Sequence, residues 1–251
     1  MYKVSSSSSE SSKRKRSLSA TLATFILCTI TQTITPFTQL PISSAAQAQS
    51  RQAHSTQAQR PQAQHPQNSH WTTFEQAVLV EHNRIRQNPQ SYIPLLENYL
   101  EDMTADGLVI HGCGRNCVLA TQEGRAAVEE AIAFLRNQPP VDPIESSTPV
   151  AQAAKALAEE QQNGQTGHIS ADGSSFLQRL EHFGVRSNGL GENISYGATS
   201  AEDVILKLLI DDGVPNRGHR TNLFTHSWEK VGAGCGTHAT YRTVCIINYA
   251  T

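Results

Sequence analysis

Apolar residues recur at helical spacing in six segments of the chain. The segments are 74–86, 92–99, 121–136, 149–162, 174–183 and 200–212. Pro89 follows the first segment and Gly164 follows the fourth, and both residue types commonly end helices. Ser200 opens the sixth segment with Asp203 three residues later, in the manner of a capping box. The pattern therefore predicts six helices.

Three shorter segments, rich in apolar and β-branched residues, predict strands. They are 192–196, 231–235 and 243–249. The last two flank the turn-like sequence GTHATYRT, so we expect a hairpin with His238 exposed in its turn. A hairpin excludes a purely parallel sheet, and the predicted helices outnumber the strands. The prediction is an α+β fold in three layers, with helices around a small, mainly antiparallel sheet.

The first 48 residues have the order of a secretory signal peptide. Basic residues at 13–16 precede an apolar stretch at 22–30, and Ala46-Gln47-Ala48 supplies the small residues of a cleavage site after Ala48. A membrane anchor is the alternative, but threonines interrupt the apolar run, which is shorter than the roughly 20 residues that span a bilayer. We therefore expect export, removal of residues 1–48, and no stable membrane span in the mature chain.

The remaining chain divides into a linker and one domain. Residues 49–70 are rich in Gln and nearly devoid of aliphatic side chains, so they cannot bury enough apolar surface to fold and are expected to be disordered. Residues 71–251 have an ordinary globular composition and a length that normally forms one core. The full chain has 20 Lys and Arg against 22 Asp and Glu, and removal of residues 1–48 takes away five basic residues and one acidic residue, so the mature chain is mildly acidic at −6. The domain sequence has no stripe of basic residues, so we expect no nucleic-acid partner.

Four cysteines follow the leader, and an even number suits disulfides in a secreted domain. Cys235 and Cys245 flank the predicted hairpin turn, where a cross-hairpin disulfide is geometrically reasonable. Cys113 and Cys117 enclose a Gly-Arg-Asn sequence and would close a tight local loop. Two local disulfides are the favoured arrangement, with cross-pairing or a zinc site as the alternatives.

Polar residues suited to binding or catalysis gather in three segments. TGHISADG contains His168, GLGENISYG contains Glu192, and DDGVPNRGHR contains Asp211, Asp212 and His219. The two aspartates end the sixth predicted helix, where the helix dipole disfavours negative charge. Another group should therefore hold them, and His219 is the nearest candidate. A layered core could bring the three segments together.

An ordered series of motifs resembles the CAP superfamily of cysteine-rich secretory proteins, antigen 5 and plant pathogenesis-related proteins. The series is HNRIRQNP, GH followed by DG, GENI, GHRTNLF with a Trp and VG after it, and a terminal IINYA. It covers essentially all of residues 71–251, and its GHR-x-N element is most similar to bacterial members with this SCP domain. The resemblance implies a three-layer α-β-α sandwich, in agreement with the periodicity.

The resemblance also implies a central cavity with two histidines and two acidic residues. In this chain these correspond to His168, Glu192, Asp211 and His219. Many relatives have Glu where this chain has Asp211, so the reach of that carboxylate differs. Counting along the helix favours Asp211 over Asp212 for this position, and an error of one residue stays open.

These four residues allow three chemical roles. Imidazole nitrogens and carboxylate oxygens are ligands for Zn²⁺ or another divalent cation, with positions left for water. The same groups could act as a catalytic acid and base, although the sequence has no nucleophile elbow and no HExxH motif. The third role is structural, in which the residues form a hydrogen-bonded network that fixes three loops.

The leading functional hypothesis is a secreted protein whose cavity binds a divalent metal, a small molecule or a lipid. One alternative is a metal-dependent hydrolase of the protease or esterase kind. Another is a module that binds proteins through its outer surface. His82, Asn83 and Arg86 in the first predicted helix are interpreted as anchors of that helix rather than as reactive groups.

Overall fold

The computed structural model describes residues 66–110, 112 and 117–251. The predicted signal peptide, 1–48, and most of the predicted linker lie outside these residues. Helix α1 (Pro66–Gln87) begins before the predicted domain, so the last residues of the linker, 66–70, are helical and not disordered as expected. Proline is accepted in the first turn of a helix and glutamine is a good helix former, which explains the earlier start.

The six predicted helices all form, and one short helix is added. The helices are α1, α2 (Ile93–Glu101), α3 (Arg125–Asn137), α4 (Thr148–Glu160), α5 (Phe176–His182), α6 (Ala201–Ile210) and α7 (Gly218–Phe224), with 3-10 turns η1 (Pro89–Tyr92) and η2 (Gln161–Asn163). The strands are β1 (Leu108–Ile110), β2 (Val118–Ala120), β3 (Glu145–Ser146), β4 (Leu190–Tyr196), β5 (Lys230–His238) and β6 (Arg242–Ala250). The sequence pattern predicted neither α7 nor the short strands β1, β2 and β3.

The main sheet has the strand order β3-β5-β6-β4. β6 pairs antiparallel with both β5 and β4, while the two residues of β3 pair parallel with β5. β1 and β2 form a separate antiparallel pair. The mainly antiparallel sheet is therefore confirmed, and β4 is one of its two edge strands.

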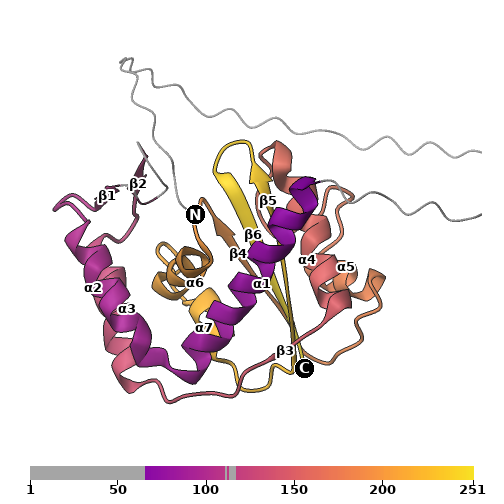
Figure 1. The fold of residues 1–251 in the computed structure, drawn as a ribbon, viewed down its shortest axis with the longest axis horizontal. Helices are drawn as coiled ribbons and strands as arrows, with labels where there is room; N and C mark the ends of the chain where they lie inside the picture. Colours follow the sequence, from indigo (N-terminus) through magenta and orange to yellow (C-terminus); the bar gives the residue numbers. More distant parts are fainter. Residues whose placement is uncertain (1–65, 111, 113–116) are drawn as a thin grey trace, which may run out of the picture. The chain divides into compact units, whose positions relative to one another are not determined.

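The helices lie on both faces of this sheet, as Figure 1 shows. α4 packs against β5 and β6 on one face, with α5 beside α4. α1 packs against β5 on the other face, where α6 and α7 contact β4, and the pair α2 and α3 lies beyond α6. This arrangement is the three-layer α+β sandwich that the sequence predicts.

Two glycines in β5 let α4 lie directly on the sheet. A Cβ atom added at Gly232 would lie 2.2 Å from the backbone nitrogen of Ala151, and one at Gly234 would lie 2.1 Å from that of Lys155. Any side chain at either position would push the helix away from the strand. The alternating glycines of VGAGCG thus set the distance between two layers.

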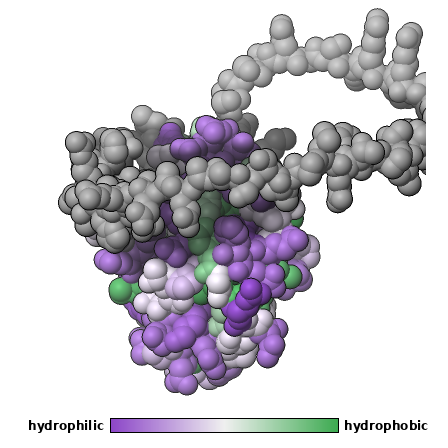
Figure 2. Space-filling view, turned by 90° about the vertical axis from the view of Figure 1, so that its right-hand side faces the viewer, coloured by the Kyte–Doolittle hydropathy of each residue, from purple (hydrophilic) through white to green (hydrophobic). Residues whose placement is uncertain are grey.

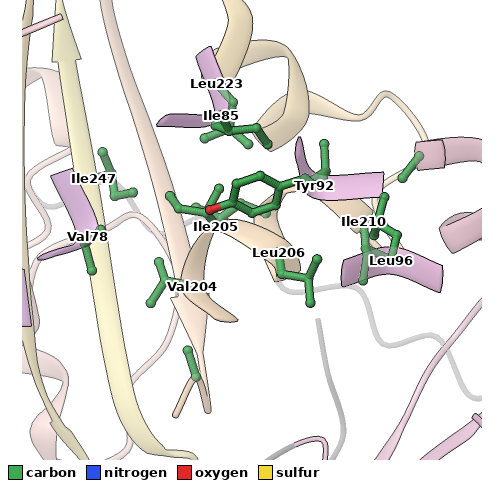
Figure 3. Packing of buried hydrophobic residues seen from close by; sticks show 14 of the residues in the cluster. Val78, Ile85, Tyr92, Leu96, Val204, Ile205, Leu206, Ile210, Leu223 and Ile247 are labelled. Atoms are coloured by element: carbon green, nitrogen blue, oxygen red, sulfur yellow. The ribbon is translucent and has the colours of Figure 1, made fainter. Parts of the chain in front are cut away.

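The largest hydrophobic core lies between the sheet and the helices of α1, α2, α3, α6 and α7. Figure 3 shows Tyr92 among Ile85, Ile205 and Leu223, which come from different elements and are almost completely buried. On the face drawn in Figure 2, hydrophilic residues dominate and hydrophobic residues form small areas between them. None of the helices in the described ranges has the length and apolar character needed to cross a bilayer.

Polar residues of α1 anchor the helix to neighbouring loops. The Asn83 amide donates to the Ile144 carbonyl at 3.0 Å and accepts from the Ile144 N–H at 2.9 Å. Arg86 is buried and donates from Nη1 to the Leu223 carbonyl at 2.7 Å. The expectation that these residues are anchors is confirmed. His82 differs, because it is buried without a hydrogen bond to either ring nitrogen in the described structure.

The hairpin of β5 and β6 carries a disulfide between Cys235 and Cys245, which lie directly opposite each other. Cys117 is also disulfide-bonded, but Cys113 lies outside the described residues, so the second local pair stays a prediction. His238 is buried at the end of β5, and its Nε2 lies 2.9 Å from the Gln165 carbonyl oxygen. The expectation that His238 is exposed was wrong because β5 extends past the predicted strand end, and Tyr241 packs against the imidazole.

Candidate functional site

The turn between α6 and α7 positions Asp211 against His219. Asp211 adopts a left-handed backbone conformation, with φ of 57°, which ends α6. Its Oδ1 lies 2.6 Å from Nδ1 of His219. Its Oδ2 accepts the backbone N–H groups of His219 at 2.9 Å and Arg220 at 3.1 Å. The carboxylate at the end of one helix is thus held by the free amides at the start of the next.

Asp212 has a different role from its neighbour. Its two carboxylate oxygens accept the backbone N–H groups of Gln122 at 2.7 Å and Glu123 at 2.8 Å, just before α3. The side chain therefore fastens the α6–α7 turn to α3 and does not contact His219. In the structure Asp211, and not Asp212, is the partner of this histidine.

Two arginines that follow Asp212 brace the same turn from the α3 side. Arg217 donates to both Glu123 and Glu130, and its hydrogen bond to Glu123 is the main cause that lowers the pKa of Glu123 to about 2. The buried Arg220 donates to Glu130 at 2.8 Å and to the Leu209 carbonyl at 2.7 Å. These contacts explain why the segment DDGVPNRGHR holds so many charges: most of them fix the turn that presents His219.

The second histidine is positioned by α5 and β4. Nδ1 of His168 lies 2.9 Å from Oε1 of Glu192, a β4 residue. Oε2 of Glu192 accepts a hydrogen bond from the buried guanidinium of Arg179, which also donates to Ser170 at 2.8 Å. Arg179 in α5 was not predicted from the sequence, because a single Arg within an amphipathic helix normally faces solvent. A buried carboxylate such as Glu192 needs a hydrogen-bond donor, and that requirement is the one argument that could have pointed to Arg179.

In both imidazoles Nδ1 contacts a buried carboxylate, and Nε2 is the nitrogen that remains for a ligand. An ionised carboxylate is only an acceptor, so each Nδ1 carries the proton and donates it to the carboxylate. The side chains of Glu192 and Asp211 are 1% and 0% exposed, whereas those of His168 and His219 are 46% and 23% exposed. Neither Nε2 atom is hydrogen-bonded to a residue within the described ranges. Each therefore keeps a lone pair for an incoming group.

The two histidines stand where two hollows meet. The inner cavity has a volume of about 220 Å³, and its lining combines apolar residues such as Leu208 and Val214 with polar and charged ones such as Lys207. The outer hollow, of about 580 Å³, is more polar and includes Asn216 and Asn222 in its lining. His168, His219 and Val214 line both. A ligand in either space would lie next to both imidazoles.

The donor set differs from the four metal ligands expected from the sequence. Both oxygens of Glu192 and both oxygens of Asp211 already accept hydrogen bonds, so the carboxylates orient the imidazoles. No group of three or more His, Cys, Asp or Glu side chains in the described part of the chain could hold a metal ion. The residues present fit a cation only through two imidazole nitrogens, with other ligands coming from water or a bound molecule.

A family model described as "CAP: Cysteine-rich secretory protein family" matches residues 129–249, the stretch that contains all four site residues. The chain carries a CAP domain. No curated protein sequence matches it significantly. Its α+β fold and its motif series agree with this membership.

Several solved structures are similar to this CAP protein. An extracellular SCP-domain protein from Bacillus anthracis is 21% identical over 47% of this chain and 36% of that chain, with a TM-score of 0.37. An outer surface protein of Borrelia burgdorferi is 17% identical over 43% of this chain and 77% of that chain, with a TM-score of 0.37. Venom allergen-like protein 4 of Schistosoma mansoni is 12% identical over 70% of this chain and 86% of that chain, with a TM-score of 0.38. The chain thus spans about a third of the length of the Bacillus anthracis protein.

Proposed function

We propose that this CAP domain is secreted and binds a ligand between His168 and His219, with the two Nε2 atoms as its polar contacts. One observation carries the proposal: each histidine has its Nδ1 bound to a buried carboxylate, and both rings line the same two hollows. A structural network would satisfy both nitrogens of each ring internally. Here the outward nitrogens have no partner in the described structure.

Two kinds of ligand are compatible with this arrangement. A divalent cation such as Zn²⁺ would be held by the two Nε2 atoms and by water, and the carboxylates behind the rings would fix the tautomer and orientation of the imidazoles. A small molecule or a lipid would place a polar group near the histidines and apolar atoms against Leu208 and Val214. The buried carboxylates orient both rings in either case.

Zinc titration by calorimetry on the full chain tests the cation. The variants are His168→Ala, His219→Ala and their double, with His226→Ala as the matched control because His226 is exposed and lies outside both hollows. We expect each site variant to weaken binding by more than about 100-fold, since it removes a ligand and not only a supporting residue. Equal affinity in the double variant and in the control would show that the histidines hold no zinc.

Hydrolysis is the second candidate, because a carboxylate behind an imidazole is the arrangement of a general base. Nε2 of His219 would take a proton from a water molecule in the cavity, while Asp211 stabilises the charged ring. A screen of ester and peptide substrates tests this role. Turnover that is lost in His219→Ala and retained in His226→Ala would support it, and turnover that is equal in both variants would exclude it.

A further inference from the structure

The edge strand β4 has one side without a partner strand. It pairs with β6 along its whole length, and no other strand lies beside it in the described part of the sheet. An unpaired strand edge offers a row of backbone donors and acceptors that can pair with another extended chain. The location of this edge therefore matters for ligand binding.

The register shows which backbone groups point away from β6. Just beyond the two ends of β4, Gly197 donates its N–H to the Thr243 carbonyl at 2.9 Å, and the Gly189 carbonyl accepts from Thr251 at 3.0 Å. Because bonding alternates along an antiparallel pair, the odd-numbered residues of β4 face β6. The N–H and C=O groups of Glu192, Ile194 and Tyr196 point to the free edge. None of them has a hydrogen-bond partner among the described residues.

The two hollows at the histidines follow this free edge. Glu192 lines the outer hollow, and Ile194, Ser195 and Tyr196 line the inner cavity. The unpaired backbone groups therefore lie along one continuous wall. They repeat every two residues, or about 7 Å, which is the spacing of an extended chain.

We propose that an extended peptide binds along β4 as an added strand and passes between His168 and His219. This inference rests on the ligand-binding cavity proposed above and names the class of ligand. A lipid chain has no groups to pair with the backbone, and a compact small molecule can pair with one residue at most. An extended backbone can satisfy Glu192, Ile194 and Tyr196 in succession.

The walls of the cavity indicate the side chains of such a peptide. Its residues alternate between the two faces of the sheet, and Ser195 lies on the α6 side near Leu208. The Ser195 hydroxyl oxygen is buried without a hydrogen-bond partner in the described structure. The outer hollow has neutral polar residues such as Asn216 and Asn222. The charged residues of the lining, Lys207, Asp211, Asp212 and Glu192, are already paired within the chain. The surroundings therefore favour small, uncharged side chains, with a hydroxyl or an amide opposite Ser195.

Affinity selection on the full chain tests this inference. The probe is a pool of capped octapeptides randomised over Ala, Ser, Thr and Val, and the bound peptides are identified by mass spectrometry. We expect specific members to be enriched. Enriched peptides should slow amide hydrogen exchange at Glu192, Ile194 and Tyr196 while leaving Asn193 and Ser195, which already bond to β6, nearly unchanged. A pool without enrichment would overturn the proposal.

N-methylated peptides provide the control for backbone pairing. Methylating alternate nitrogens of an enriched peptide removes the donors of one edge and leaves every side chain in place. We expect one methylation register to weaken binding more than tenfold and the other to have little effect. Binding that tolerates both registers would contradict strand addition, as would slow exchange of the Ile194 and Tyr196 amides before any peptide is added.

A groove-filling variant locates the binding site independently. Val214 lines both hollows with an apolar side chain, and only its backbone is bonded to the turn, with its N–H donating to the Asp211 carbonyl at 3.2 Å; Val214→Trp should therefore block the peptide and Val214→Ala should not. Retained binding in Val214→Trp would place the peptide elsewhere. The zinc titration with the histidine variants tests the proposed function independently of this inference, because zinc binding depends on the Nε2 atoms and not on the edge of β4.

Discussion

His168 and His219 are each held by a buried carboxylate, but the two carboxylates are fixed by different parts of the chain. Glu192 accepts from the side chain of Arg179, which reaches it from α5. Asp211 accepts from the backbone N–H groups of His219 and Arg220 at the start of α7. The first pair depends on a particular side chain, and the second depends on the path of the backbone.

The two rings also differ in their exposure. His168 comes from the loop before α5 and has a side chain that is 46% exposed, while the His219 side chain is 23% exposed. The His219 pair lies in a turn that two backbone hydrogen bonds to Asp212 tie to the start of α3. We therefore expect the His168 pair to respond strongly to single side-chain changes and the His219 pair to respond weakly.

The largest effect should come from Arg179→Met, which removes the cation behind Glu192. It would leave a buried carboxylate without its charged partner and lower the free energy of unfolding by about 3–5 kcal/mol. Urea unfolding at pH 7 measures the change. The double variant Arg179→Met/Glu192→Gln should recover part of the loss because no uncompensated charge remains. A double variant as unstable as the sum of its single changes would contradict this explanation.

His82 differs from His168 and His219 because it is fully buried and no carboxylate is hydrogen-bonded to its ring in the described structure. Burial, followed by the charge of Arg86, lowers its pKa from 6.5 to about 3. The unfolded chain therefore takes up the proton first, so stability falls as the pH drops from about 6.5 to about 3. At pH 4 the loss should reach about 3 kcal/mol.

Urea unfolding of wild type and His82→Leu between pH 7 and pH 4 measures this loss. The two proteins share their other titrating groups, so the difference in their pH slopes isolates His82. Wild type should lose more stability than the variant over this range. Parallel slopes would mean that the imidazole is protonated in the folded protein as readily as in the unfolded chain.

Asp211→Asn and Asp212→Asn separate the two neighbouring aspartates. Each removes a charge that accepts two backbone N–H bonds, and each should cost about 1–3 kcal/mol of stability in thermal or urea unfolding. Only Asp211→Asn should change the tautomer of His219, because Asp212 does not contact this ring. A changed His219 tautomer in Asp212→Asn would show that the aspartate roles are assigned wrongly.

The smallest effect should come from Glu130→Gln on the outer side of the α6–α7 turn. Glu130 binds Arg217 and Arg220, but its side chain is about half exposed and the pairs are screened by solvent. We expect a loss of less than about 1 kcal/mol in urea unfolding, with unchanged zinc affinity. A large loss of zinc affinity would mean that this network, and not Asp211, controls the position of His219.

The fold could be predicted largely from periodicity, because the five longer helices α1, α2, α3, α4 and α6 bury apolar residues at helical spacing. α7 was missed because it follows directly after a Pro-Asn-Arg turn and has no side-chain cap, whereas the equally short α5 begins at the capping residue Ser175 and is followed by Gly184. β3 has only two residues and forms through pairing with β5, so no local pattern marks it. These elements depend on tertiary contacts.

The four site residues were identified from the resemblance to a family, and among the partners of the carboxylates the sequence indicated only His219, for the two aspartates. The pairing of His219 with Asp211 requires the left-handed conformation of Asp211 and the start of α7. The role of Arg179 depends on the packing of α5 against β4. The closeness of His219 to the aspartates along the chain did indicate their pairing, which the structure confirms. The sequence contains no signal for the Arg179 contact, because it arises from the arrangement of separate elements.

The central claim is that both histidines carry the proton on Nδ1 and offer Nε2 to one shared ligand. Long-range ¹H–¹⁵N NMR of the imidazole rings, recorded during a zinc titration of the full chain, tests it most directly. The account predicts Nδ1–H tautomers for His168 and His219 in the free protein, and shifts of both Nε2 resonances over the same range of added zinc. Nε2–H tautomers in the free protein, or Nε2 resonances that do not move together, would contradict it.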